Sequence, residues 1–358
     1  MIVITYGDEI VKNTYDTLSA SDISSYLNTG MAVSIKPNLV VPCPASDGAT
    51  THPEIAEGII LFLHDFGVKN IKIIESSWVG DSTKRAYKYC GYEELSRKYG
   101  VPLIDLKSDT STTYKFGEYN ITVCDEAMNT DFLINVPVLK AHCQTRFTCC
   151  MKNLKGCIPD AEKRRFHTQG IHKPVAALNM IIKTGYCVID GICGDLSFEE
   201  GGNPVTSNRI IAGRNPLLLD SYCAELIGYR PDEIEYISYG RKLGVGDYYS
   251  RDTKFVELNP QAKPALDVVR NRVSERYQRL IDEDAACSAC YSSLVYALHR
   301  IKGNPRTDGK IHIGQGFAGK SGAGLGIGNC TRGFAKCVPG CPPKATDILA
   351  MLSPTNKL

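Results

Sequence analysis

The sequence predicts an α/β protein with a mostly parallel, layered sheet and a separate helical module at its C-terminus. Two observations predict the sheet: short apolar runs recur over the first two thirds of the chain, and amphipathic helical patterns lie between several of them. The module is predicted because this alternation stops near residues 255–265 and a long helical pattern follows at 265–301. We therefore expect one domain at 1–258 and a second at 259–358.

Seven apolar runs are predicted to be strands, and they supply the core of the first domain. In order they are residues 1–6, 31–36, 68–75, 101–106, 132–138, 186–192 and 209–212. The clearest helix starts near Pro53, because proline suits a first helical turn and Glu54 places a carboxylate there, while Gly67 suits its end. Alternation of strands and helices favours parallel pairing.

Composition limits the class of protein. The 358 residues are 43% hydrophobic and 22% charged with a net charge of +2, which describes a globular chain rather than a disordered or nucleic-acid-binding one. Residues 1–10 lack a basic leader region, and no run approaches the roughly 18 apolar residues of a membrane span. We therefore expect a cytoplasmic protein that binds neither nucleic acid nor membrane.

The fifteen cysteines are odd in number, and a reducing cytoplasm keeps thiols for metals, redox chemistry or packing rather than for disulphides. Five lie near the C-terminus: Cys287 and Cys290 form a C-x2-C pair, and Cys330, Cys337 and Cys341 follow. A C-x2-C pair brings two thiolates to one metal centre, and further ligands can arrive from distant segments. This spacing is compatible with four ligands at one centre.

Two neighbouring features favour an iron–sulphur cluster at this centre. Glycines at 322, 324, 326 and 328 let backbone N–H groups approach cluster sulphurs, and a proline follows Cys341, as it does beside other iron–sulphur ligands. We predict that Cys287, Cys290, Cys330 and Cys341 ligate one 4Fe-4S cluster and that Cys337 does not. A structural zinc site or simple packing is the alternative, but zinc usually takes two short-spaced pairs of ligands.

A nucleotide-binding signature occurs in the same region without its structural context. Residues 314–321 match G-x4-G-K-[ST], and a strand-like run at 310–313 precedes them. The glycine-dense residues 322–328 are unsuited to the helix whose N-terminus would hold the phosphates. We therefore expect no ATP or GTP site here.

The middle segment, residues 140–173, is strongly basic, with eight lysines and arginines against two acids. The strand before it should stop pairing at Pro137, at the edge of the sheet where α/β proteins bind ligands. We predict that Lys140, His142 and Lys152 line a site for a small anionic molecule. The alternative is a solvated basic face.

Two further groups of residues were weighed as metal sites. One is the set Cys143, Cys149, Cys150 and Cys157, and the other is Asp190, Asp195, Glu199 and Glu200. On one helix the first set would be spread by about 10 Å per seven residues, so we expect buried packing unless the segment is irregular. For the acids we expect a solvated turn, with a divalent-cation site or a general base as the alternative.

Six motifs occur in one order along the chain. They are KPNLV at 36–40, THPE at 51–54, ES at 75–76, INVPVLKAH at 134–142, KNLKG at 152–156 and VIDGI at 188–192. Over roughly residues 30–228 they resemble the iron–sulphur family known as domain of unknown function 362. The resemblance implies an iron–sulphur protein, often through an attached ferredoxin domain, and implies no general activity.

The C-terminal cysteines depart from that family pattern. The ferredoxin repeat C-x2-C-x2-C-x3-C does not occur. Cys330 and residues 338–343 are instead similar to the last-ligand segment of nickel–iron hydrogenase small subunits and of the related complex I subunit, whose cluster is 4Fe-4S. This second resemblance spans about a dozen residues.

The sequence thus predicts an oxidoreductase in which a 4Fe-4S cluster exchanges electrons with a small anionic substrate. Two alternatives stay open: a non-redox enzyme whose cluster is structural or a Lewis acid, and an electron-transfer protein that serves a redox partner protein and has no substrate of its own. A cluster with three cysteines and an open iron favours Lewis-acid work, whereas a fully ligated and reducible cluster favours electron transfer.

Overall fold

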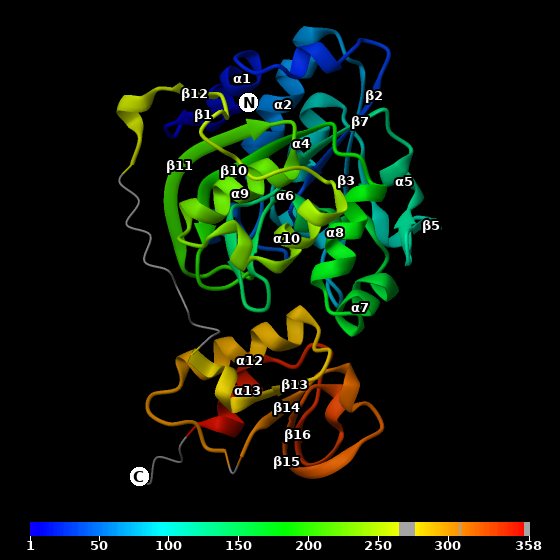
Figure 1. Ribbon diagram of the computed structural model, residues 1–358, viewed down its shortest axis with the longest axis vertical. Helices are drawn as coiled ribbons and strands as arrows, with labels where there is room; N and C mark the ends of the chain where they lie inside the picture. The colour runs from blue at the N-terminus through cyan, green and yellow to red at the C-terminus, as the bar shows by residue number, and fades with distance from the viewer. Residues whose placement is uncertain (265–275, 308, 354–358) are drawn as a thin grey trace.

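The computed structural model describes residues 1–264, 276–307 and 309–353, which form two parts (Figure 1). The larger part, at the top of the view, is an α/β domain built from the first two thirds of the chain. The smaller part lies below it and contains the C-terminal residues, coloured yellow to red. Residues 255–258 still belong to the large sheet, so the chain leaves the large domain after them.

An eight-stranded sheet forms the centre of the large domain. Its order is β12 (Phe255–Leu258), β1 (Ile2–Tyr6), β11 (Pro204–Gly213), β10 (Tyr186–Asp195), β7 (Phe132–Val136), β2 (Ala32–Pro37), β3 (Asn70–Glu75) and β4 (Leu103–Asp105). Within this sheet β11 alone runs antiparallel to its neighbours, so the mostly parallel sheet is confirmed. All seven predicted strands are present. The edge strand β12 was not predicted, because its residues are exposed or half-buried and lack an apolar run.

Helices cover both faces of this sheet. One face packs against α1 (Ile10–Ser19), α2 (Pro53–Phe66), α3 (Thr83–Tyr89) and α4 (Tyr92–Tyr99), and the other against α8 (His172–Ile181), α9 (Pro216–Leu226) and α10 (Glu235–Leu243). Successive strand residues alternate between the two cores, as Ile73 and Ile74 do. Helix α2 begins at Pro53 and ends at Gly67 with a left-handed φ of 99°, as predicted.

Shorter elements connect these layers. They are the hairpin of β5 (Ser111–Phe116) and β6 (Tyr119–Cys124), α5 (Asp125–Met128), the ribbon of β8 (Lys140–His142) and β9 (Arg146–Thr148), α6 (Cys150–Asn153), the 3-10 turn η4 (Leu154–Cys157) and α7 (Asp160–Thr168). The segment 142–156 is therefore irregular rather than one helix. Among the described residues, no helix combines the length and the apolar character that crossing a membrane requires.

The chain reverses its direction across the sheet between β2 and β7. From β2 it crosses to β3 and then to β4, whereas β7 pairs with the opposite side of β2. The loops that leave the carboxyl ends of β2 and β7 therefore run in opposite directions and leave a crevice between them. Open α/β sheets bind ligands in a crevice of this kind. Strand β7 ends at Val136, immediately before Pro137, as predicted, although Val138 still forms an isolated parallel bridge with Asp190 of β10.

The C-terminal module is a second α/β unit, so the prediction of a helical module was wrong. Its sheet is wholly parallel, in the order β13 (Ile281–Glu283), β14 (Ile311–Ile313), β15 (Ser321–Ile327) and β16 (Gly333–Val338), and it packs against α12 (Ser288–Arg300) and α13 (Ala345–Leu352). The pattern missed β13 because it is short, and β15 because glycines fill much of it and leave little apolar periodicity. Of the predicted helix at 265–301, the part from Ser288 onward is helical, whereas 265–275 lies outside the described residues.

The nucleotide-binding signature has the secondary structure of a sheet rather than of a P-loop. Strand β14 precedes it, but Ser321 begins β15, so the expectation that no helix follows is confirmed. The ammonium of Lys320 is exposed and lies 3.5 Å from the carboxylate of Asp284.

A buried ion pair joins the ends of β2 and β3. The ammonium of Lys36 lies 2.8 Å from the carboxylate of Glu75, and both side chains are at most 3% exposed. The Glu75 carboxylate also accepts the N–H groups of Leu39 and Ser76, and Lys36 donates to the carbonyl of Pro37. Each charge therefore has several hydrogen-bond partners, which is the condition under which a buried pair is tolerated.

Replacement of Glu75 by glutamine should lower the free energy of unfolding by about 3 kcal/mol or more, because it leaves the Lys36 ammonium buried without a counter-charge. The control is Glu57→Gln, which breaks a more exposed pair with Lys98 and should cost less than about 1 kcal/mol. Chemical denaturation followed by circular dichroism measures both variants. Similar small losses in the two would contradict a central role for the buried pair.

ATP and GTP should not bind with micromolar affinity, because a phosphate placed after Ser321 would meet a strand instead of a helix N-terminus. Isothermal titration calorimetry with each nucleotide tests this. A micromolar affinity that Lys320→Ala abolishes would show that the signature is functional after all.

Candidate active site

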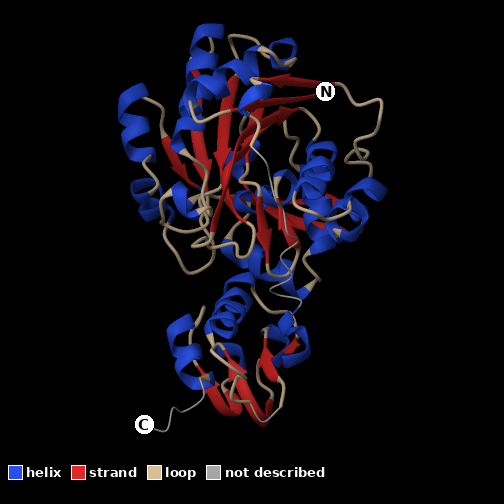
Figure 2. Ribbon diagram, turned by 90° about the vertical axis from the view of Figure 1, so that its left-hand side faces the viewer, coloured by secondary structure: helices blue, strands red, loops and turns tan. Residues whose placement is uncertain are grey.

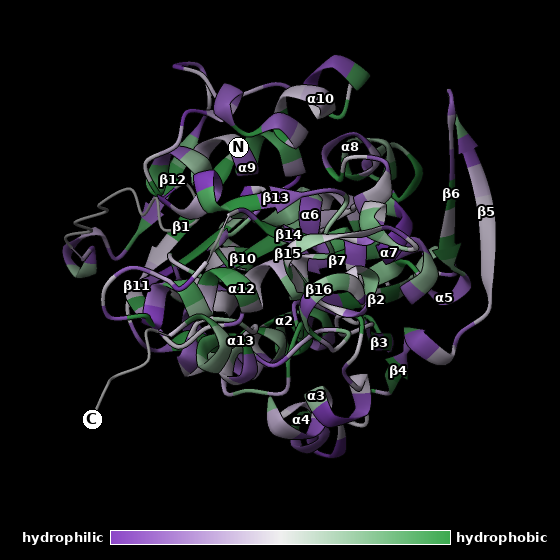
Figure 3. Ribbon diagram, turned by 90° about the horizontal axis from the view of Figure 1, so that it is seen from below, coloured by the Kyte–Doolittle hydropathy of each residue, from purple (hydrophilic) through white to green (hydrophobic). Residues whose placement is uncertain are grey.

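A cavity of about 110 Å³ lies where the C-terminal module meets the carboxyl edge of the large sheet. Views from the side and from below show the module covering this end of the domain (Figure 2 and Figure 3). Charged side chains of the large domain dominate its lining: Lys36, Glu75, Lys140, Lys152, Lys155, Lys163, Arg164 and Glu199. The module contributes Cys287, Ser288 and Ala289. Both parts of the chain therefore build one site.

The parallel topology explains why these side chains meet. Lys36 and Glu75 lie at the carboxyl ends of β2 and β3, and Lys140 and Glu199 follow β7 and β10. The carboxyl ends of parallel strands share one edge of the sheet, so residues far apart in sequence converge there. The other lysines and Arg164 come from α6, η4 and α7, which follow the ribbon of β8 and β9.

Gly156 lets η4 approach the buried ion pair. A Cβ atom at this position would overlap the Glu75 carboxylate and the Lys36 ammonium. The amide of Asn153 in turn contacts the Lys36 ammonium through its oxygen at 3.4 Å. A side chain larger than hydrogen at 156 would push η4, and Lys155 with it, away from the sheet.

Glu199 is the centre of the group that the basic middle segment predicted. Its carboxylate contacts Nε2 of His142 and lies 3.7 Å from the ammonium of Lys152. Nδ1 of His142 accepts the N–H groups of Gln144 and Thr145 at 3.0 and 3.1 Å, so the ring proton is on Nε2, the nitrogen that contacts Glu199. Burial lowers the pKa of His142 to about 3, and the ring is therefore neutral.

Lys140 is buried and holds two backbone segments together. Its ammonium donates to the carbonyls of Ala49 and Glu199 at 2.7 and 2.9 Å. Burial lowers the pKa of Lys140 to about 8. The structure thus brings Lys140, His142 and Lys152 together around Glu199, with the two lysines in the cavity lining and His142 behind Glu199. Their catalytic role stays a prediction.

Lys155 is a half-buried cation without an acidic partner. Its ammonium lies 3.3 Å from Nε2 of His167, and among the described residues no carboxylate forms an ion pair with it. Burial, and then the positive charge of Lys152, lower the pKa of Lys155 to about 7. The cavity therefore holds positive charge that the protein itself leaves uncompensated, and a bound anion would compensate it.

The four cysteines predicted as ligands come from three segments of the module. Cys287 precedes α12 and Cys290 lies in its first turn, whereas Cys330 lies in a 3-10 turn after β15 and Cys341 follows β16. Burial raises the pKa of Cys287, and the charges of Cys341 and Cys330 raise it further. Cys337 instead donates to a backbone carbonyl from within β16. Cluster ligation by the four cysteines stays a prediction.

This cysteine group adjoins the cavity. Cys287 is part of the cavity lining, as is Ser288, whose hydroxyl donates to the side-chain oxygen of Gln144 at 2.9 Å. Burial raises the pKa of Cys287, while the positive charges of Lys155 and Arg164 oppose that rise. The two sites that the sequence placed in different parts of the chain are therefore neighbours.

The remaining cysteines of the middle segment are buried, as packing predicted, but they also form groups that could hold a metal ion. Ligand atoms of His142, Cys143 and Glu199 lie within 4.8 Å of one another. The same holds for Cys149, Cys150 and Asp220. Lys140 and Lys152 beside Glu199 oppose a cation at the first group by repulsion.

The expectation of a solvated acidic turn after β10 was wrong. Asp190 and Asp195 are fully buried, because Asp190 accepts from His52 and Asp195 accepts three backbone N–H groups of the loop that follows. Glu200 accepts the hydroxyl of Ser292 on α12, and burial raises its pKa to about 8. Asp190 and Glu200 have partners that lie far away in sequence, which a local pattern does not reveal.

Three residues of the cavity were not among the predicted site residues: Lys36 and Glu75 lie outside the basic middle segment, and Lys155 was counted in its charge but not assigned to the site. Each lies within one of the ordered motifs, KPNLV, ES and KNLKG. The ordered motifs therefore pointed to these three site residues, whereas local charge and cysteine spacing did not.

Comparison with known proteins agrees with those motifs. Residues 33–225 match the family described as Domain of unknown function (DUF362). A thylakoid-associated protein of Synechocystis sp. is 23% identical over 234 residues, which are 62% of this chain and 71% of that protein.

Two solved structures are similar at lower levels. The lactate racemase apoprotein of Thermoanaerobacterium thermosaccharolyticum is 14% identical with a TM-score of 0.43, over 65% of this chain and 57% of that one. A protein of Thermotoga maritima is 16% identical with a TM-score of 0.40, over 62% and 60%. The chain thus spans less than two thirds of either structure. Because the family match covers more than half of the chain and contains the motifs that build the cavity, this protein belongs to the DUF362 family.

Proposed function

We propose that this protein is an iron–sulphur oxidoreductase that acts on a small anionic molecule. In this proposal Cys287, Cys290, Cys330 and Cys341 hold a 4Fe-4S cluster, and the substrate occupies the cavity beside them. The observation that carries the proposal is that Cys287 lines the same cavity as five lysines. A redox partner protein in a reducing cytoplasm would supply or remove the electrons.

The thiol geometry supports a cluster over a single zinc ion. Four thiolates on one zinc, at about 2.3 Å each, lie about 3.8 Å from one another. Within the described residues, no three of these four thiols come within 4.8 Å of one another. A wider arrangement suits a cluster, whose cysteines each bind a different iron. When bound, such a cluster supplies one-electron transfer at the edge of the cavity.

The lysines support an anionic substrate. Lys36 and Lys163 are already engaged by Glu75 and by carbonyls and a hydroxyl of the loop after β3, and Lys140 is engaged by two carbonyls. Lys155 has no acidic partner, and Lys152 shares Glu199 with His142. We assign Lys155 and Lys152 to contact with the substrate, and Lys140 and His142 to holding Glu199 in place.

Lys155 also supplies a proton near the cysteine group. Burial and the charge of Lys152 lower its pKa to about 7, so its ammonium releases a proton near neutral pH more readily than an exposed lysine does. A reduced anion that gains negative charge would take a proton from the nearest such donor. This arrangement fits reduction of a carboxylate-bearing or oxyanionic molecule better than a site that only stores electrons.

Protein purified without oxygen should contain about four iron and four sulphide per chain, and dithionite should produce an electron paramagnetic resonance signal. Cys290→Ser should lose or convert the cluster. Cys337→Ser is the matched control and should keep it, because this thiol donates to a backbone carbonyl within the module's sheet. Stoichiometric zinc without iron would refute the cluster, and a cluster that dithionite leaves unreduced would favour the Lewis-acid alternative.

Sulfate should bind in the cavity more weakly as the pH rises from about 6.5 to about 9. Its own charge is constant over this range, whereas Lys155 and Lys140, with pKa values of about 7 and about 8, lose theirs. Lys155→Met should weaken binding at the lower pH by about tenfold or more, the value of one charge-assisted hydrogen bond. Lys173→Met, in the same basic segment but stacked on Tyr239, should leave the affinity unchanged. Calorimetry that finds no pH dependence and no effect of Lys155→Met would contradict the anion site.

A further inference from the structure

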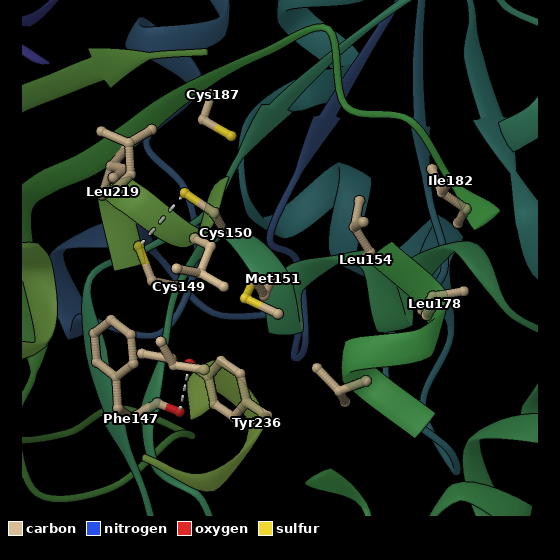
Figure 4. Close-up of a cluster of buried hydrophobic side chains, with 14 of the residues drawn as sticks. Phe147, Cys149, Cys150, Met151, Leu154, Leu178, Ile182, Cys187, Leu219 and Tyr236 are labelled. Atoms are coloured by element: carbon tan, nitrogen blue, oxygen red, sulfur yellow. Dashed lines mark hydrogen bonds between the residues drawn. The ribbon is translucent and has the colours of Figure 1, made fainter. Parts of the chain in front are cut away.

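A second group of metal-binding side chains lies inside the large domain, away from the cavity. Cys149 and Cys150 precede and begin α6, and Asp220 lies on α9 opposite them. All three are fully buried, and Cys149 and Cys150 belong to the hydrophobic core that α8, α9 and α10 cover (Figure 4). Nothing in the proposed reaction uses these residues.

The distances within this group suit one metal ion. The sulphurs of Cys149 and Cys150 are 3.9 Å apart, and two thiolates on one tetrahedral zinc are separated by about 3.8 Å. An oxygen of Asp220 lies within 4.8 Å of both sulphurs. This is the compact arrangement that the C-terminal cysteines lack.

Two more thiols flank the pair and offer a fourth ligand. Cys187, on β10, lies near Cys150 (Figure 4). Cys223 lies one helical turn after Asp220 and interacts with Cys149. Four thiols and one carboxylate therefore lie close together at the edge of a hydrophobic core, with the buried amide of Asn135 donating to the carbonyl of Cys150.

The carboxylate of Asp220 needs a counter-charge. Its two oxygens accept the N–H groups of Cys150 and Met151 at 2.7 and 3.0 Å. In the described parts of the chain, no lysine or arginine forms a hydrogen bond or an ion pair with Asp220. Burial raises the pKa of Asp220 well above its ordinary value, because an ionised carboxylate is costly to bury, and a divalent cation bound beside it would favour the ionised form.

We propose that Cys149, Cys150 and Asp220 bind a single zinc ion, with Cys187 or Cys223 as the fourth ligand. Binding releases the thiol protons and completes a tetrahedral site with no position for substrate, as in structural zinc sites. The ion would fasten α6 to β10 and α9. Because α6 also carries Lys152, the zinc would fix the position of that ammonium at the cavity. This proposal does not depend on the C-terminal cluster.

The test is metal analysis of the full-length protein with variants that separate the two thiol groups. Wild-type protein should retain about one zinc per chain after dialysis, and X-ray absorption at the zinc edge should show sulphur at about 2.3 Å together with one oxygen or nitrogen at about 2.0 Å. Asp220→Asn and Cys150→Ser should each lose at least nine tenths of this zinc while keeping the iron of the C-terminal cluster. Cys124→Ser removes a buried thiol that donates to the carbonyl of Leu106 and should keep the zinc.

Three results would overturn the proposal. The first is less than about one tenth of a zinc per chain in wild-type protein refolded with zinc or cobalt. The second is zinc content unchanged in Asp220→Asn. The third is a zinc spectrum with four sulphur ligands and no light atom in protein whose zinc is lost in Cys341→Ser and kept in Cys150→Ser, which would place the ion at the C-terminal cysteines. The wild-type measurements decide the question even if a core variant fails to fold.

Discussion

The ammonium of Lys36 and the carboxylate of Glu75 are both removed from water where β2 and β3 end, and either would be costly to bury alone. Their contact fixes the carboxyl edge of the sheet beside the point where the chain reverses direction. Gly156 and Asn153 pack against the pair, so it also sets the position of α6 and η4. The contact between Lys36 and Glu75 therefore positions Lys152 of α6 and Lys155 of η4 in the cavity.

Charge in the cavity is arranged in two classes. Some cations have partners within the protein: Lys36 pairs with Glu75, Lys140 donates to two carbonyls, and Lys163 donates to the loop after β3. Others, above all Lys155, which is half-buried, have no acidic partner in the part of the chain that the structure describes. The cations with partners hold the strand ends and loops in place, whereas the cations without an acidic partner favour binding of an anion. Because Cys287 lies in the same lining, an anion held by Lys155 would lie next to the cysteine group.

The sequence predicted the large domain well and the small one poorly, for the same physical reason. Strands buried on both faces, such as 132–136, are continuous apolar runs that stand out in a sequence. Strands β13 and β15 are short or rich in glycine, and a flat, parallel sheet built from them has no such signature. The prediction of a solvated acidic turn was wrong for a similar reason. Acidic residues such as Asp190 are expected to be solvated until a distant partner is known, here His52.

The sequence by itself determined the parallel α/β domain, the end of β7 at Pro137, the family motifs and the spacing of the C-terminal cysteines, because each depends on residues close together in the chain. Only the tertiary structure decided that Cys287 meets Lys155 in one cavity, that Glu199 joins His142 and Lys152, and that Asp220 faces Cys149 and Cys150. These contacts join residues about 50 to 130 positions apart. They depend on strand order and on how the module docks, which local propensity and periodicity do not encode.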